Sequence, residues 1–354
     1  MNLSPRGSHQ PRTVNPGGRQ GITSFGHPQA KQGDAPGSAA PLAWAASAPA
    51  PLAKGASFRP LGIPLEVEAN EPELLTAVGE ACRGWEDDAD LAVRALHLNL
   101  LLDDDPCEMG EPQIRVDGQY LRIEGGGIRA AADADNGHAW CRVSAQHLLD
   151  HDRLRRTLLE PVILFLVTRR GRAPIHAAGF LAGDLAILLA GPAGAGKSCL
   201  ALAAHQAGFR LLSDDTVYIS AAPVLRIWGI PSAIHLFPED APVSGCGPMR
   251  VRNGKLKLAV PVRPTWSPST ARRAALCVLD FGTSAALRKI GQAEALRGCG
   301  PLEAGFDLLR APIEAALERL TRNGAWRLTL SARPAEAIAL LVDNLSALGG
   351  EVAA

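Results

Sequence analysis

Short apolar runs alternate with longer amphipathic stretches along most of the chain beyond residue 58. Apolar runs of strand length, bounded by turn residues, predict strands at residues 174–182, 185–190, 209–213, 225–228, 274–280 and 326–331. Stretches of three or more turns predict helices at residues 154–170, 197–207, 302–322 and 334–348. Pro161 should kink or restart the first of these helices. Strands and helices in this order are typical of an α/β fold.

The earlier part of the chain has a different pattern. A helix at residues 71–82, a strand at 91–102 and a hairpin at 114–123, turning at Asp117-Gly118, predict a small α+β module. Residues before this module are rich in Pro, Gly, Ser, Ala and Gln and have almost no periodic apolar pattern, which predicts disorder. We therefore expect a disordered tail at residues 1–58, a small α+β module at 59–150 and a larger α/β domain at 151–354.

Composition excludes several classes of protein. The formal net charge is +0, so nothing predicts an electrostatic surface for nucleic acid. No apolar run approaches the roughly 18 residues of a membrane helix, and the prolines within residues 41–53 argue against a signal peptide. An odd number of cysteines without C-x-x-C spacing predicts reduced thiols in a cytoplasmic protein. His147 and His151 lack the glutamate of an H-E-x-x-H motif, and we interpret them as a surface pair.

The most informative motif is the octet GPAGAGKS at residues 191–198, which fits the pattern G-x-x-x-x-G-K-[ST] and directly follows the apolar run at 185–190. Such a loop wraps backbone N–H groups around a polyphosphate. Its lysine adds a positive charge at the outer phosphates, and its serine hydroxyl can ligate magnesium. The residues expected to bind the phosphates of a nucleotide are Gly191, Pro192, Ala193, Gly194, Ala195, Gly196, Lys197 and Ser198.

An acidic pair, Asp214-Asp215, closes the predicted strand at residues 209–213, soon after the octet. Parallel strands that are joined by a helix place their carboxyl ends at one edge of a sheet, where ligands bind. Both carboxylates are therefore expected beside the phosphate-binding loop. There, one can hold Mg²⁺ and the other can take a proton from an acceptor hydroxyl.

Three positions allow more than one interpretation. Asp280 closes the apolar run at 274–280 as the acid of a Walker B strand does; in that role it would make the chain a generic NTPase, and otherwise it is a turn residue before Gly282. His176 lies on the predicted strand at 174–182 and can either face the phosphate-binding edge or pack in the sheet. A predicted hairpin at residues 251–261 carries two lysines, which can contact phosphate or lie in a solvated turn.

Residues 174–220, with the sequence PIHAAGFLAGDLAILLAGPAGAGKSCLALAAHQAGFRLLSDDTVYIS, resemble the catalytic core of the HPr kinase/phosphorylase family. They are more closely similar to the HPr-kinase-related serine kinases of peptide-modification gene clusters. The resemblance implies a P-loop kinase core, of the type shared with ATP-dependent phosphoenolpyruvate carboxykinases, in residues 151–354. It also implies that His176 matches the active-site histidine of the family.

The function implied by the resemblance is transfer of the γ-phosphoryl group of ATP to a hydroxyl, with serine of a peptide or protein as the acceptor. Lys197 would neutralise developing charge, Asp214 would act as the base, and His176 would assist. Ser198 and Asp215 would bind Mg²⁺. The assignment of the two aspartates to these two roles can also be reversed.

The chain departs from the family at two places. Cys199 stands where HPr kinases have a glutamate, and the segment LRIWGIPSAIHLFPED at residues 225–240 only loosely echoes their second signature, with no acid beside Arg226. Two other functions therefore stay open: a small-molecule kinase or carboxykinase-like enzyme on the same scaffold, and a nucleotide-binding regulatory module without transfer activity. Association into a homo-oligomer is also left open.

Overall fold

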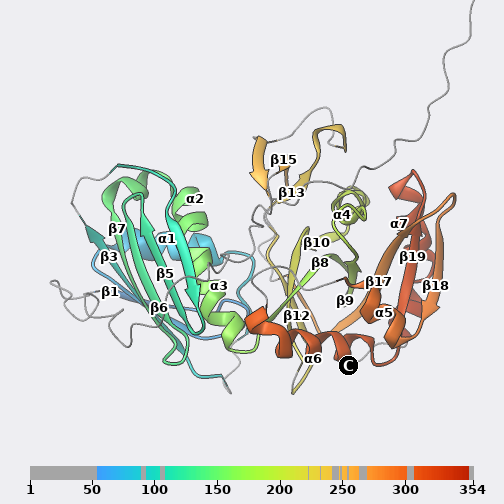
Figure 1. Ribbon diagram of the computed structural model, residues 1–354, viewed down its shortest axis with the longest axis horizontal. Coiled ribbons are helices and arrows are strands. Elements are labelled where there is room, and N and C mark those ends of the chain that lie inside the picture. Colours follow the sequence, from blue (N-terminus) through green and yellow to red (C-terminus); the bar gives the residue numbers. More distant parts are fainter. Residues whose placement is uncertain are drawn as a thin grey trace, which may run out of the picture.

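The computed structural model describes residues 54–88, 93–103, 108–221, 223–231, 233–240, 247, 249–252, 255–262, 269–300 and 307–350. Over these residues the chain forms a seven-stranded sheet, a nine-stranded sheet and a three-stranded sheet. The two large sheets lie beside each other, and the small sheet stands over one end of the nine-stranded sheet (Figure 1). The predicted α/β class is confirmed. The predicted tail lies outside the described residues up to residue 53.

The seven-stranded sheet is mixed: β2, β3 and β7 are parallel neighbours, and the remaining pairs are antiparallel. Its strands, in spatial order, are β1 (Lys54–Phe58), β2 (Leu65–Ala69), β3 (Leu96–Asp103), β7 (His138–Ser144), β6 (Ile128–Asp133), β5 (Tyr120–Gly125) and β4 (Gln113–Asp117). Helix α1 (Pro72–Cys82) begins with a proline in its first turn and buries one apolar face against this sheet.

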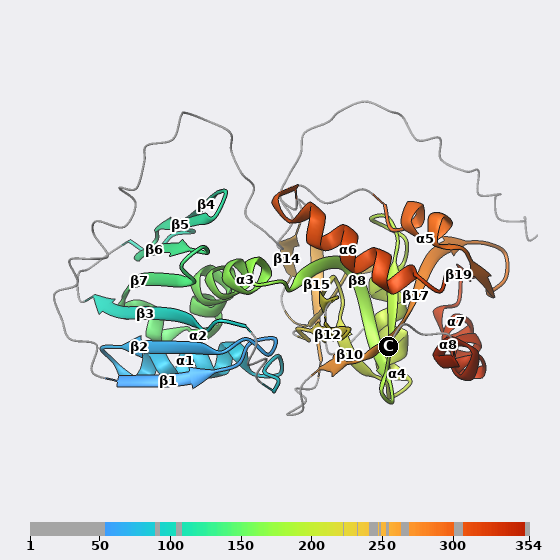
Figure 2. The same ribbon diagram turned by 90° about the horizontal axis from the view of Figure 1, so that it is seen from below.

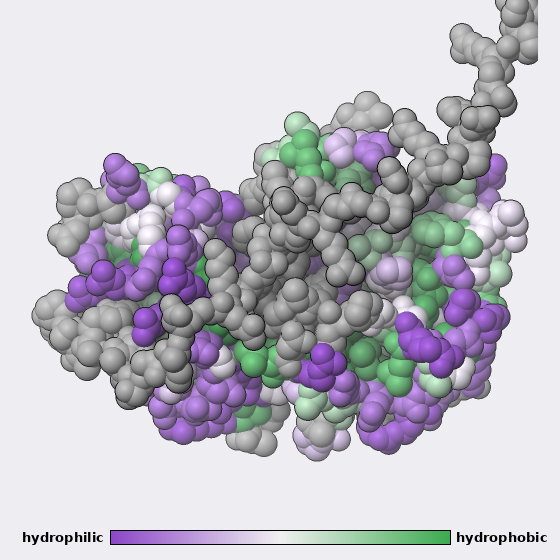
Figure 3. Space-filling view, viewed as in Figure 1, coloured by the Kyte–Doolittle hydropathy of each residue, from purple (hydrophilic) through white to green (hydrophobic). Residues whose placement is uncertain are grey.

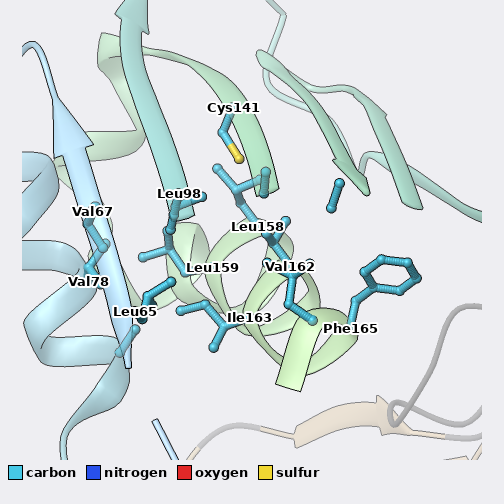
Figure 4. Packing of buried hydrophobic residues seen from close by; sticks show 14 of the residues in the cluster. Leu65, Val67, Val78, Leu98, Cys141, Leu158, Leu159, Val162, Ile163 and Phe165 are labelled. Carbon is cyan, nitrogen blue, oxygen red and sulfur yellow. The ribbon is translucent and has the colours of Figure 1, made fainter. Parts of the chain in front are cut away.

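The helical segment after this sheet belongs to the same core. It consists of α2 (His151–Leu154), a π-helical turn (Arg155–Leu159) and α3 (Glu160–Arg169), with Pro161 in the first turn of α3. Side chains of this segment, among them Leu159 and Ile163, lie against residues of β2 and β3 such as Leu65 and Leu98 (Figure 4). At Pro161, where a kink or restart was predicted, α3 begins directly after the π-helical turn, and the backbone stays helical across this junction.

Two of the predicted domain boundaries differ from the boundaries that the packing of the strands and helices indicates. Strand β1 lies inside the range predicted as a disordered tail, and it pairs with β2 along its whole length. Its sequence has no clear signal because Phe58 is its only large apolar residue. Residues 151–169 were expected in the second domain, but their apolar face packs on the first sheet, which moves the boundary to about residue 170.

The nine-stranded sheet is built around a central strand, β8, which has β9 on one side and both β10 and β11 on the other. In spatial order its strands are β16 (Thr270–Ala271), β12 (Arg226–Gly229), β11 (Thr216–Ser220), β8 (Ala173–Ala182), β9 (Leu185–Ala190), β17 (Arg273–Phe281), β19 (Ala325–Leu330) and β18 (Ala286–Ile290), with β10 (Arg210–Ser213) beside β8. The strands predicted in this region are thus confirmed, with small shifts at their ends.

Helices cover both faces of this sheet. α4 (Lys197–Gln206) and α7 (Pro334–Asp343) pack on one face, and α5 (Gln292–Gly298) and α6 (Arg310–Thr321) pack on the other. Figure 2 shows α4 and α6 on opposite sides of the strands. The small sheet lies on the α4 face and consists of β13 (Ala233–Leu236), β15 (Lys255–Pro261) and β14 (Met249–Arg252).

Four predicted elements have other bounds in the structure. The helix expected from residue 302 begins at Arg310, after a short 3-10 turn, and residues 301–306 lie outside the described residues. The last helix ends at Asp343 and is followed by α8 (Leu345–Gly350), because the side chain of Asn344 donates to the carbonyl of Leu340 (2.8 Å) at the break. The strand expected at 91–102 is β3. The hairpin expected at 251–261 is formed by β14 and β15, but its turn lies outside the described residues.

Buried polar contacts fix the two large sheets to each other. Asp87, whose side chain is 8% exposed, accepts from Trp228 Nε1 (2.8 Å) and from Arg226 Nη2 (3.1 Å), both on β12. Arg172 stacks over the Trp228 ring and donates from Nε to the carbonyl of Leu61 (2.9 Å). Trp228 therefore packs in the core of the first sheet although it belongs to the second.

We expect Asp87→Ala to lower the free energy of unfolding by about 2–3 kcal/mol, because it removes the carboxylate that neutralises Arg226 and accepts from Trp228. Urea unfolding followed by tryptophan fluorescence measures this change. Asp88→Ala is the matched control, since Asp88 is exposed and should change the stability by less than about 0.5 kcal/mol. Equal effects of the two substitutions would contradict this account of the interface.

Candidate active site

The octet at residues 191–198, named here the glycine-rich loop, joins the end of β9 to the start of α4. Gly194 and Gly196 both have φ of +86°, which side chains other than glycine rarely adopt. A Cβ on Gly196 would also lie 3.0 Å from Leu330 Cδ1. The loop therefore needs glycine to turn from the sheet into the helix, and it leaves Pro192, Ala193 and Gly194 exposed at the helix N-terminus.

Lys197 is the first residue of α4, and its side chain bends back over the loop. The residue is only 7% exposed, and Nζ donates to the carbonyls of Gly191 (2.7 Å) and Pro192 (3.1 Å). Ser198 follows it in the first turn and is half-buried. The ammonium group and the first backbone N–H groups of the helix thus meet at the same place, which is the arrangement that binds phosphate oxygens.

His176 lies level with the start of the glycine-rich loop. In the antiparallel pair of β8 and β9, Ala177 is opposite Ala190, so the preceding residue of β8 is beside Gly191. His176 Nδ1 is 3.5 Å from Asp215 Oδ1, and both side chains are largely buried. The structure therefore brings together two residues that the sequence analysis selected separately.

The acidic pair lies on the other side of β8. It occupies the break between β10 and β11, where Ser213 is opposite Gly179 and Thr216 is opposite His176. The strand that ends at the acidic pair, β10, is not a direct neighbour of β9, because β8 lies between them. The two strands nevertheless run in the same direction, and two strand spacings, about 10 Å, separate the acidic pair from the end of β9.

Asp214 has a partner that the sequence analysis missed. The residue is 7% exposed, and its Oδ2 accepts from the backbone N–H of His235 (2.9 Å) and lies 3.1 Å from His235 Nδ1. His235 lies on β13 of the small sheet, which packs on α4. The only sequence signal for His235 was its place in the segment that loosely echoes the second family signature.

All of these groups lie on the same face of the sheet as α4. His176 alternates with Ala178 and Phe180, which share a core with Leu200 of α4. Ile234 and Leu236, on either side of His235, belong to the same core. The site therefore consists of the glycine-rich loop, two aspartate–histidine pairs and the start of α4.

Asp280 has a different environment. Asp280 follows Leu276 and Val278 at every second position of β17, so the three side chains point to the same face of the sheet. Leu276 and Val278 pack in the core against α6, on the face opposite to α4. The side chain of Asp280 is 51% exposed and accepts from Arg327 Nη1 (2.9 Å), while Nη2 of the same arginine donates to Glu294 (2.9 Å). This geometry favours the interpretation of Asp280 as a residue at the exposed end of a sheet strand.

A further acid lies beside the first turn of α4. Burial, together with the charge of the Asp240 carboxylate and its hydrogen bond with the thiol, raises the pKa of the Cys199 thiol to about 11. Cys199 is therefore protonated at neutral pH and is not a nucleophile. The charge of Lys257, on β15 of the small sheet, lowers the pKa of the same thiol, and its ammonium lies 5.4 Å from the Phe237 ring.

Other residues selected from the sequence have structural roles. His147 is fully buried, and its Nε2 lies 2.7 Å from the carbonyl of Gly126; His151 Nδ1 lies 2.8 Å from Glu80. Their interpretation as a surface pair is therefore wrong, because a short 3-10 turn directs His147 into the interior beside the seven-stranded sheet. Among the residues the structure describes, the cysteines are free and no group of three or more His, Cys, Asp or Glu could hold a metal ion.

In the face shown in Figure 3, hydrophilic residues lie over both large sheets, with smaller apolar patches between them. Within the described part of the chain, every helix is too short or too polar to cross a membrane.

Comparisons with known proteins do not assign a family: no protein-family model matches the chain, and no curated protein matches it.

Proposed function

We propose that this protein is an ATP-dependent kinase that transfers the γ-phosphoryl group to a hydroxyl, with serine of a peptide or protein as the acceptor. The observation that carries the proposal is the position of Asp214 and Asp215, across β8 from the glycine-rich loop and on the face that carries α4. The proposal includes a P-loop kinase core of the HPr kinase/phosphoenolpyruvate carboxykinase type. It also includes a cytoplasmic location, where ATP is supplied and thiols stay reduced.

The glycine-rich loop supports binding of the triphosphate. Its exposed backbone and the N-terminus of α4 would contact phosphate oxygens, and Lys197 already lies against the loop. On binding, the ammonium of Lys197 would exchange its two carbonyl partners for phosphate oxygens. This exchange places its charge where negative charge develops during transfer.

Mg²⁺ fits the donors that lie at this site. The oxygen atoms of Ser198 and Asp215 are hard ligands, and magnesium in kinase sites takes one or two protein oxygens together with substrate phosphates. When bound, the ion would neutralise charge on the β- and γ-phosphates. His176 would hold Asp215 in position through the contact between Nδ1 and Oδ1.

Asp214 is the group that we assign as the base. His235 fixes Oδ2 of this carboxylate with its backbone N–H and its ring, so the orientation of the side chain is set before substrate binds. The carboxylate would take the proton of the acceptor hydroxyl. The hydroxyl oxygen would then form a bond to the γ-phosphorus as the bond to the bridging oxygen of ADP breaks.

Incubation of the purified protein with γ-labelled ATP and a lysate of its own organism tests the proposal. With γ-labelled ATP we expect label on serine of a polypeptide. With ATP that is labelled in the α-phosphate instead, we expect the polypeptide to stay unlabelled. Label in a metabolite would instead indicate a small-molecule kinase. Tight ATP binding without any transfer would indicate a regulatory module, and both of these results would contradict the proposal.

A further inference from the structure

An exposed aromatic ring lies directly beside the glycine-rich loop. Phe281 is the last residue of β17 and is 63% exposed. Its ring atoms Cζ and Cε1 would lie 3.8 and 3.9 Å from a Cβ placed on Gly196. Phe281 alternates with Leu279 and Cys277, which belong to the core on the α4 face, so the ring and the loop are on the same face of the sheet.

The backbone that carries this ring is held firmly. Phe281 is opposite Leu330 in the parallel pair of β17 and β19, and the next N–H, of Gly282, donates to the Leu330 carbonyl (2.9 Å). Leu330 itself is buried and lies on the same side of Gly196 as the ring. Residues 282–284 are exposed, which leaves the outer face of the ring open.

The strand order places different residues on the two sides of the glycine-rich loop. The acidic pair and His176 lie on the β8 side of β9, and Phe281 lies on the β17 side. A triphosphate that directs its γ-phosphate toward the acidic pair must direct its nucleoside the other way. That direction leads to Phe281.

We propose that Phe281 is the platform on which the base of the bound nucleoside triphosphate stacks. A single exposed apolar residue is common on protein surfaces and needs no explanation elsewhere. Here the backbone that carries the ring is held by strand pairing, the ring is largely exposed, and it lies directly beside the loop, which are the properties of a base-stacking site. The inference rests on the proposed binding of ATP phosphates in the glycine-rich loop.

Stacking acts on the π-face that every base has, so it contributes to affinity without selecting one base. Phe281 should therefore strengthen the binding of ATP and GTP to a similar degree. It should contribute nothing to the binding of a polyphosphate that has no base.

Calorimetric titration of the full chain with Mg·ATP and with Mg·tripolyphosphate tests this inference. Phe281→Ala should weaken ATP binding by roughly tenfold and leave tripolyphosphate binding unchanged. Phe281→Trp should bind ATP at least as tightly as the unaltered protein, because tryptophan presents a larger stacking surface.

Two results would overturn the inference. Unchanged ATP affinity in Phe281→Ala would show that the ring does not contact the base. Equal weakening of both ligands would show that the ring only supports the loop. If the unaltered protein binds neither ligand, the proposed function itself fails. If the unaltered protein binds tripolyphosphate and Lys197→Ala abolishes this binding, the phosphate site stands, and an unchanged ATP affinity in Phe281→Ala then counts against the stacking inference alone.

Discussion

Lys197→Ala should reduce phosphoryl transfer by roughly 10³-fold or more while leaving the fold intact. Phosphoryl transfer depends mainly on positioning and on charge stabilisation, and Lys197 is the cation that the structure places in the glycine-rich loop. The fold should survive because α4 is anchored by other residues, Leu200, Ala201 and Ala204, which face the core. Transfer from γ-labelled ATP measures the activity, and the thermal unfolding midpoint checks the fold.

Lys289→Ala is the matched control for this change. Lys289 is an exposed lysine on β18, at the far edge of the same sheet. Its removal takes away one positive charge without touching the loop, so transfer should stay near the level of the unaltered protein. Appreciable turnover by Lys197→Ala would disprove the assignment of residues 191–198 as the phosphate site.

The second large effect is expected at the acidic pair. Asp214→Asn should lower transfer by about 10²- to 10⁴-fold but retain ATP binding, because asparagine has the same shape and can still accept from the His235 N–H, yet it cannot take a proton. Steady-state transfer and equilibrium ATP binding, measured on the same preparation, separate the two properties.

Asp280→Asn serves as the matched control for Asp214→Asn. It makes the same chemical change at the end of β17, where the carboxylate binds Arg327 on the opposite face of the sheet. Transfer by this variant should be close to that of the unaltered protein. If Asp214→Asn lost both transfer and ATP binding, Asp214 would hold the metal and Asp215 would be the candidate base.

Local elements near the site could be predicted well from the sequence. The continuous apolar run at 185–190 and the glycine-rich octet after it define β9 and the start of α4 within one residue. The two residues between the strands predicted at 174–182 and 185–190, Gly183 and Asp184, join β8 to β9 in an antiparallel pair. These elements are encoded by neighbouring residues, so short-range patterns are sufficient for them.

Pairing between distant segments could not be predicted in the same way. The sequence indicated that β10 follows α4, but not that β8 lies between β10 and β9. His235 was missed because its position beside Asp214 depends on how the small sheet packs on α4. The helical segment at 151–169 has an apolar face that does not specify which sheet it will cover. Each of these features arises from long-range packing.

The location of the metal tests the central claim most directly. A crystal structure of the protein with a non-hydrolysable ATP analogue and Mn²⁺, with the ion located by its anomalous scattering, would show which carboxylate binds it. We predict that the ion lies beside the glycine-rich loop, bound by Ser198 and by a carboxylate of the Asp214-Asp215 pair. An ion bound at Asp280, with both members of the pair away from the triphosphate, would contradict the account.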